Sequence, residues 1–149
     1  MSSLKAHELG STIIKHILSC TNTSPDDVII GQSLTAAQGQ NPARQSVLAS
    51  GLSESVTATT INMLCGSGLK SCALGYQAIK CGDSNVVVCG GQESMSQAPH
   101  CINLRNGHKM NDATMVDCNY IHAFIFRLNF NKEIISFTIK SHDQRWINR

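Results

Sequence analysis

Residues 56–91 read VTATTINMLCGSGLKSCALGYQAIKCGDSNVVVCGG, and this stretch decides the fold class. Val56–Ile61 is rich in Thr and Val, which favours a strand. Five side chains with apolar surface then recur at helical spacing before Gly82: Leu69, Cys72, Ala73, Tyr76 and Ile79. Asn85–Cys89 is too short and too β-branched for a helix. A strand, a helix and a strand joined by short links are typical of a parallel βαβ unit, so we expect an α/β fold with helices packed on a mostly parallel sheet.

The residues before this unit predict two further helices and one strand. The face of the first helix carries five apolar side chains: Leu9, Ile13, Ile14, Ile17 and Leu18. Val28–Ile30 is a short apolar run closed by Gly31, which predicts a brief buried strand. Asn41 followed by Pro42 predicts the start of the second helix, because Asn caps helices and Pro fits the first helical position. Gly51 stands where the chain can leave that helix in a left-handed conformation.

Composition excludes several classes of protein. The chain has 149 residues, 42% of them hydrophobic, which suits one globular domain. No apolar run reaches the roughly 18 residues of a membrane span. Twelve Lys and Arg are scattered among ten Asp and Glu, so we expect no nucleic-acid surface. The first eight residues resemble neither a secretory nor an organellar signal, and we expect a cytoplasmic protein.

The seven cysteines predict neither a disulfide framework nor a metal site. Their number is odd, no two are spaced Cys-x-x-Cys, and no interval repeats. We therefore expect no metal, and we expect each thiol to be either a buried small side chain or a reactive nucleophile. Three cysteines fall in predicted elements: Cys72 on the helix face, Cys81 near the helix end and Cys89 in a strand. These positions favour buried side chains over reactive thiols.

Cys65 stands where the first strand of the unit meets the helix, in the run Asn62-Met63-Leu64-Cys65-Gly66-Ser67-Gly68. Gly66 and Gly68 allow a tight turn and a close approach of substrate to the backbone. The first-turn N–H groups and the positive end of the helix dipole would favour a thiolate, the form that attacks a carbonyl, and would hold a developing oxyanion. The alternative from spacing alone is a small buried Cys in a glycine-softened turn.

A second polar segment, Gly90-Gly91-Gln92-Glu93-Ser94-Met95-Ser96-Gln97-Ala98-Pro99-His100, follows the second strand of the unit. Glycines at the carboxyl end of a parallel strand mark the sheet edge where α/β proteins bind ligands. Glu93 and His100 are candidates for an acid/base pair. The alternative is that Glu93 anchors a loop by hydrogen bonds and that His100 is a surface residue.

Three motifs in order resemble the thiolase family, in particular its biosynthetic, acetoacetyl-CoA members. They are Asn41-Pro42-Ala43-Arg44-Gln45, Asn62–Lys70, and Gly90–Ser96 running into Ala98–Cys101 and Leu104-Arg105. The resemblance implies that Cys65 takes the acyl group from a thioester, and that a second acetyl-CoA or free CoA then attacks the acyl-enzyme. It makes CoA thioesters substrates, with no separate cofactor. It places Met95 in the acyl pocket and the Asn41 helix near a dimer interface, which implies a homo-oligomer.

The resemblance covers about residues 9–112 and implies an incomplete thiolase N-terminal domain. The family's first strand, its loop domain and its C-terminal half have no counterpart, and its Asn-Glu-Ala-Phe, Gly-His-Pro and Cys-x-Gly-Gly-Gly motifs do not occur in this sequence. The composition changes near residues 112–118, so we divide the chain into a partial domain, 1–117, and a divergent tail, 118–149. The tail is either an edge strand or strand pair with a polar end, or sequence foreign to the domain before it. Two functions remain open: an acetyl transferase acting through Cys65, or an inactive partial thiolase that at most associates with a complete homologue.

Overall fold

The computed structural model describes residues 3–105, 107, 110, 112–119 and 136–140. In this part of the chain the main sheet has the strand order β2-β1-β3-β6. Strands β1 (Asp27–Gly31), β2 (Thr57–Ile61) and β3 (Val86–Gly91) are parallel, and β1 lies between the other two. The predicted parallel unit is therefore confirmed, with β1 inserted between its two strands.

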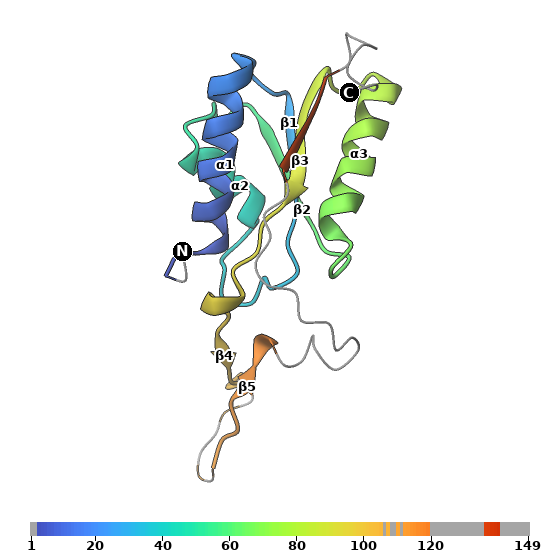
Figure 1. The fold of residues 1–149 in the computed structure, drawn as a ribbon. Helices are drawn as coiled ribbons and strands as arrows, with labels where there is room; N and C mark the ends of the chain where they lie inside the picture. Colours follow the sequence, from blue (N-terminus) through green and yellow to red (C-terminus); the bar gives the residue numbers. More distant parts are fainter. Residues whose placement is uncertain (1–2, 106, 108–109, 111, 120–135, 141–149) are drawn as a thin grey trace.

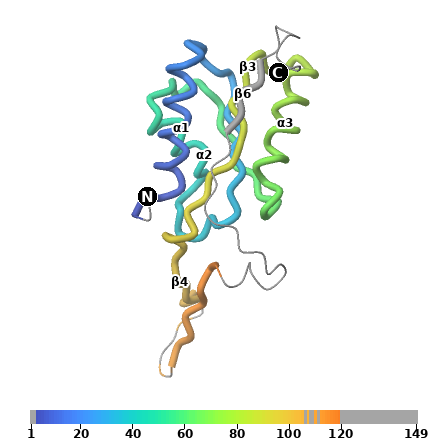
Figure 2. Tube along the Cα trace, in the orientation of Figure 1, coloured from blue at the N-terminus to red at the C-terminus, as the bar shows by residue number. Residues whose placement is uncertain are grey.

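Helices cover both faces of the sheet (Figures 1 and 2). Helix α1 (Ala6–Thr21) and helix α2 (Pro42–Ala49) lie together on one face, and helix α3 (Ser67–Cys81) lies on the other. The core under α1 and α2 consists of Ile14, Val28, Ile30, Ala43, Val47, Val56 and Val88. The core under α3 consists of Ile29, Val87 and Cys89, with Ile61, Cys72, Leu74, Ala78 and Ile79 packed against it. Alternate residues of β1 thus face opposite layers, as the two-residue period of a strand requires.

The local signals for helix ends are confirmed. Asn41 caps α2, since its side chain accepts a hydrogen bond of 3.1 Å from the backbone of Arg44, and Pro42 is the first helical residue. Gly51 (φ 83°) and Gly82 (φ 83°) both adopt the left-handed conformation just past α2 and α3. These positions favour glycine because a Cβ is strained there.

The carboxyl ends of the three parallel strands lie together at the lower edge of the main sheet in Figure 1. From there the chain passes through a short 3-10 helix, η1 (Met95–Gln97), into a two-stranded hairpin of β4 (His100–Cys101) and β5 (Val116–Asp117). The hairpin extends away from the main sheet. Residues that follow β2 and β3 therefore share one edge of the molecule.

The expected tail, residues 118–149, lies mostly outside the described residues. Within it, β6 (Ser136–Lys140) pairs antiparallel with β3 and forms the outer strand of the main sheet. Whether the tail is an edge strand, a strand pair or foreign sequence stays a prediction. The domain boundary at residue 117 stays a prediction.

Candidate active site

The elbow between β2 and α3, residues 62–67, places Cys65 at the shared carboxyl edge of the strands. The side chain of Cys65 is exposed, so the alternative of a buried structural thiol is wrong. Leu64, just before it, adopts the left-handed conformation with φ 50°, which costs a non-glycine residue on the order of 1 kcal/mol. Gly66 is the N-cap of α3 and has right-handed φ, so the left-handed residue of this turn is Leu64 rather than a glycine.

Two polar side chains hold the elbow in shape. Ser67 Oγ donates to the carbonyl of Leu64 over 2.6 Å and accepts from the backbone N–H of Met63 over 2.8 Å. Asn62 Oδ1 accepts from the N–H of Leu64 over 3.0 Å, and its amide nitrogen donates to the carbonyl of Ser33 over 3.0 Å. These bonds fix the backbone on both sides of Cys65. Sequence reasoning missed both residues, although short side-chain-to-backbone bonds from Asn and Ser are the usual signal of such turns.

Glycines let the start of α3 lie directly on the strand ends. A Cβ on Gly31 would lie 2.6 Å from the carbonyl oxygen of Ser67, and one on Gly91 would lie 3.3 Å from the Cα of Gly68. Gly31 and Gly91 are themselves paired across β1 and β3. Gly68 therefore brings α3 close to the backbone of β3. Its further expected part in holding an oxyanion stays a prediction.

The first turn of α3 keeps two backbone donors available beside Cys65. The N–H of Ser67 donates to the carbonyl of Leu64, and that of Lys70 donates to the carbonyl of Gly66. Among the described residues, the N–H groups of Gly68 and Leu69 meet no acceptor. Free first-turn amides carry the positive end of the helix dipole, which suits an anion.

A buried network of two glutamines and a serine lies between α2 and the carboxyl ends of β1 and β3. The sequence did not lead us to expect it. Gln92 Nε2 donates to Gln32 Oε1 over 2.9 Å, and Ser46 Oγ donates to Gln92 Oε1 over 2.6 Å. All three side chains are at most 2% exposed. Gly10 of α1 makes room, since a Cβ there would collide with Gln92 Oε1. The repeated Gly-Gln at the ends of β1 and β3 was the available signal.

Glu93 and His100 do not form the candidate acid/base pair. The carboxylate of Glu93 accepts from the backbone N–H groups of Ser33, over 2.8 Å, and Leu34, over 3.1 Å, which makes it a loop anchor. His100 Nε2 instead lies 4.0 Å from Asp117 Oδ2, on an exposed side chain. Met95, expected in an acyl pocket, begins η1 at the same edge as Cys65 and is 46% exposed.

The structural reading of Cys89 is supported by its environment. The side chain is fully buried under α3, and burial, followed by the neighbouring Cys72, raises the pKa of its thiol to about 12. A thiol with such a pKa stays protonated at neutral pH and is a poor nucleophile. Cys81, at the last position of α3, is exposed, which corrects the expectation that it is buried.

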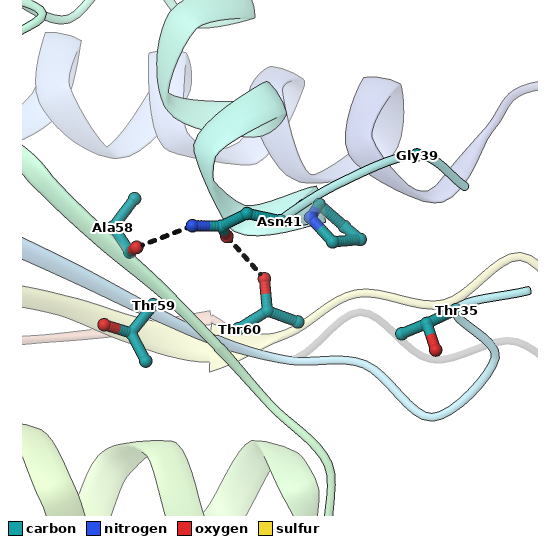
Figure 3. Close-up of a pocket in the computed structure, with 7 residues that line it drawn as sticks. Thr35, Gly39, Asn41, Ala58, Thr59 and Thr60 are labelled. Carbon is teal, nitrogen blue, oxygen red and sulfur yellow. Dashed lines mark hydrogen bonds between the residues drawn. The ribbon is translucent and has the colours of Figure 1, made fainter. Parts of the chain in front are cut away.

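A pocket of about 530 Å³ lies on the outer side of β2, next to the N-terminus of α2 (Figure 3). Its lining consists of Thr35, Gly39, Asn41, Pro42, Ala58, Thr59 and Thr60. Asn41 ties α2 to β2 here, since its amide donates to the carbonyl of Ala58 over 2.9 Å and its oxygen accepts from Thr60 Oγ1 over 2.7 Å. None of the predicted site residues lines this pocket, so it is separate from the elbow.

Comparison with known proteins decides the family. The family model of the thiolase N-terminal domain matches residues 1–138. The chain belongs to the thiolase family. Among its curated relatives, the acetyl-CoA acetyltransferases of Allochromatium vinosum and Rhizobium meliloti are each 52% identical, over 121 and 115 residues respectively. A probable acetyl-CoA acetyltransferase of Escherichia coli is 49% identical over 116 residues.

These matches cover most of this thiolase chain but only a part of each relative. They include 78%, 75% and 75% of the chain, and 31%, 29% and 30% of the three relatives in the same order. The chain thus spans about a third of the length of the curated relatives it matches. The α/β thiolase N-terminal fold is confirmed. In the part of the chain that the structure describes, none of the helices combines the length and the apolar character needed to cross a bilayer.

Proposed function

We propose that the elbow accepts an acetyl group from a CoA thioester onto Cys65, as the first half of acetyl transfer between acetyl-CoA or acetoacetyl-CoA and CoA. The carrying observation is the exposed thiol of Cys65 beside the two unpaired first-turn amides of α3. Membership in the thiolase family and the names of the relatives support the choice of an acyl-CoA substrate.

The step forms one bond and breaks one. The Cys65 thiolate attacks the thioester carbonyl, so that a carbon–sulfur bond forms and the carbonyl oxygen becomes an oxyanion. The N–H groups of Gly68 and Leu69 are the donors we assign to this oxyanion, since charge develops there in the transition state. The intermediate then expels CoA as a thiolate and leaves an acetyl thioester on Cys65. Met95 would contact the acyl methyl from the same edge of the sheet.

Completing the reaction requires more than the elbow supplies. Condensation needs a base to remove a proton from a second acetyl-CoA, and the resemblance assigns that base and a further oxyanion donor to motifs that this sequence does not contain. Losing one oxyanion donor alone typically costs about a hundred- to a thousandfold in rate. We therefore expect acylation of Cys65 to be much easier to detect than turnover.

The experiment is acylation of the purified chain by acetyl-CoA, followed by peptide mass mapping and by release of the CoA thiol. We expect an acetyl group on Cys65 and none on Cys81, the exposed thiol at the opposite end of the same helix. Cys65→Ala should abolish the adduct, whereas Cys81→Ala should leave it unchanged. Equal acetylation of both thiols, or none on Cys65, would reject the proposed role.

The second candidate is an inactive partial thiolase that associates with a second copy or with a complete homologue. It applies to these 149 residues taken alone, which match 31% of the length of the Allochromatium vinosum enzyme. This candidate predicts no acetyl-Cys65, together with a stable complex when the chain is mixed with a full-length acetyl-CoA acetyltransferase. Size-exclusion chromatography with light scattering distinguishes such a complex from a homo-oligomer and from a monomer.

A further inference from the structure

We propose that Cys101 and Cys118 form a dithiol–disulfide couple that, when oxidised, closes a covalent link across the base of the β4–β5 hairpin. Their Sγ atoms lie 3.3 Å apart, and the Cys118 thiol donates a hydrogen bond to the sulfur of Cys101. Both side chains are partly exposed. The two sulfurs are therefore in contact at a surface that a small oxidant can reach.

The register of the hairpin brings the two sulfurs together. β4 and β5 pair antiparallel, with His100 opposite Asp117 and Cys101 opposite Val116, and the N–H of Cys118 donates to the carbonyl of Pro99 over 3.1 Å. Cys101 and Cys118 are therefore diagonal neighbours, which share one face of an antiparallel pair. The backbone ladder, rather than chance rotation of the intervening loop, holds the thiols in contact.

The other described cysteines lack this combination of contact and access. Cys72 and Cys89 interact with each other, but Cys89 is fully buried. Cys20, Cys65 and Cys81 are exposed, and among the described residues none of the three has a sulfur partner. The hydrogen bond to Cys101 raises the pKa of the Cys118 thiol.

The oxidation balances with a low-molecular-weight disulfide, such as oxidised glutathione, as the electron acceptor. One sulfur attacks this disulfide as a thiolate and expels the first glutathione thiolate. The second sulfur then attacks the mixed disulfide and expels the other. The protein loses two electrons and two protons, and the small disulfide becomes two thiols. Since an S–S bond is about 2.05 Å long, the sulfurs need to approach by roughly 1.2 Å.

The link would fix the segment that leads out of the main sheet. Asn119, next to Cys118, donates its side-chain amide to the carbonyl of Met95 over 3.0 Å. Oxidation would therefore tie together β4, β5 and η1. This inference concerns sulfurs outside the elbow and does not depend on acyl transfer by Cys65.

The experiment is a redox titration of the purified chain in glutathione buffers, with trapping of free thiols and peptide mapping without reduction. The same titration in urea gives the effective concentration of the two thiols in the unfolded chain, which is millimolar for a short flexible loop. We expect the native value for Cys101–Cys118 to exceed the value in urea by at least about tenfold. In Cys101→Ser and Cys118→Ser, the remaining thiol should carry glutathione instead, and Cys81→Ser should not change the titration.

Three results would overturn the proposal. The first is an effective concentration of the Cys101 and Cys118 thiols in the native chain that is equal to or below the value in urea. The second is separate glutathionylation of Cys101 and Cys118 without a disulfide between them. The third is a link from either cysteine to Cys65 or Cys20 in the native chain. Failure of Cys65 acetylation would leave the titration unaffected, so the two proposals fail independently.

Discussion

Helix α3 has an exposed cysteine at each end, and this allows the chemistry of the elbow to be tested within one molecule. Cys65 lies just before the N-cap, Gly66, and Cys81 is the last helical residue. The helix dipole stabilises an anion near the N-terminus and disfavours one near the C-terminus, by about 0.3–1 kcal/mol at each end. The two effects add, so the dipole favours negative charge at the N-terminal end of α3 over the C-terminal end by about 0.6–2 kcal/mol.

This free-energy difference translates into a modest ratio of rates. At about 1.4 kcal/mol per factor of ten, this corresponds to roughly a three- to thirtyfold preference for a full negative charge at the N-terminal end of α3. A stabilised thiolate is also a weaker nucleophile, with a Brønsted coefficient of about 0.4–0.5. Only about half of the free-energy difference therefore appears in the rate of reaction. Reaction with a neutral aromatic disulfide should therefore be about two to five times faster at Cys65 than at Cys81.

The assay is a timed reaction of the native chain with dithiodipyridine, quenched by acid and read by peptide mass mapping. Because both thiols are in the same sample, reagent concentration and time cancel in the ratio. Unfolding in urea should bring the ratio close to one, and high salt should reduce it because the dipole is screened at the surface. If Cys65 reacts no faster than Cys81 in the native chain, the reasoning that α3 prepares Cys65 as a nucleophile is refuted.

Three further predictions concern the scaffold. Gly31→Ala should lower the free energy of unfolding by about 1–3 kcal/mol, because the added Cβ would press on the backbone of α3. In Gly68→Ala the Cβ would lie 3.5 Å from its nearest neighbour, so the free energy of unfolding should stay unchanged or rise. Urea titration compares the two variants. Gln92→Leu should lower the free energy of unfolding by about 1–3 kcal/mol, because it leaves the buried Oε1 of Gln32 without a donor. The cost should fall when Gln32→Leu is added, which a double-mutant cycle measures. Hydrogen bonds from the backbone N–H groups of Val86 and Asn85 hold the pKa of Asp26 below its ordinary 3.8. Their contribution to stability should therefore be present above pH 3.8 and be lost as the pH falls below it. Asp26→Asn should flatten the dependence of the free energy of unfolding on acid pH, and an unchanged dependence would contradict this.

The sequence predicted the elements well because their signals are local. The strand at Val28–Ile30 is a β-branched run, and the start of α2 at Asn41 and Pro42 depends on capping rules that involve neighbouring residues only. The position of Cys65 at a strand-to-helix junction followed from the same reasoning. The order of the strands did not, because nothing within residues 56–91 indicates that β1 inserts between β2 and β3.

The parts of the site that the sequence did not predict depend on contacts between distant residues. Gln32 and Gln92 are 60 residues apart and meet only because Gly31 and Gly91 are paired across two strands. Proximity in sequence makes His100 a candidate partner of Glu93, yet the register of the hairpin places it opposite Asp117. Polar partners across a sheet follow from register, which a single sequence does not specify.

The elbow combines an exposed thiol with a backbone held by hydrogen bonds, and the two properties come from different residues. The thiol of Cys65 makes none of the bonds that shape the turn, since these belong to Asn62 and Ser67 and to the glycine contacts beneath α3. The side chain of Cys65 makes no hydrogen bond that holds the turn, so its thiol is free to react. The strained backbone at Leu64 is held by hydrogen bonds with Asn62 and Ser67. Replacing Cys65 should therefore remove chemistry without removing structure, whereas replacing Ser67 should disturb both. This separation of roles is what makes the acetylation experiment on Cys65→Ala interpretable.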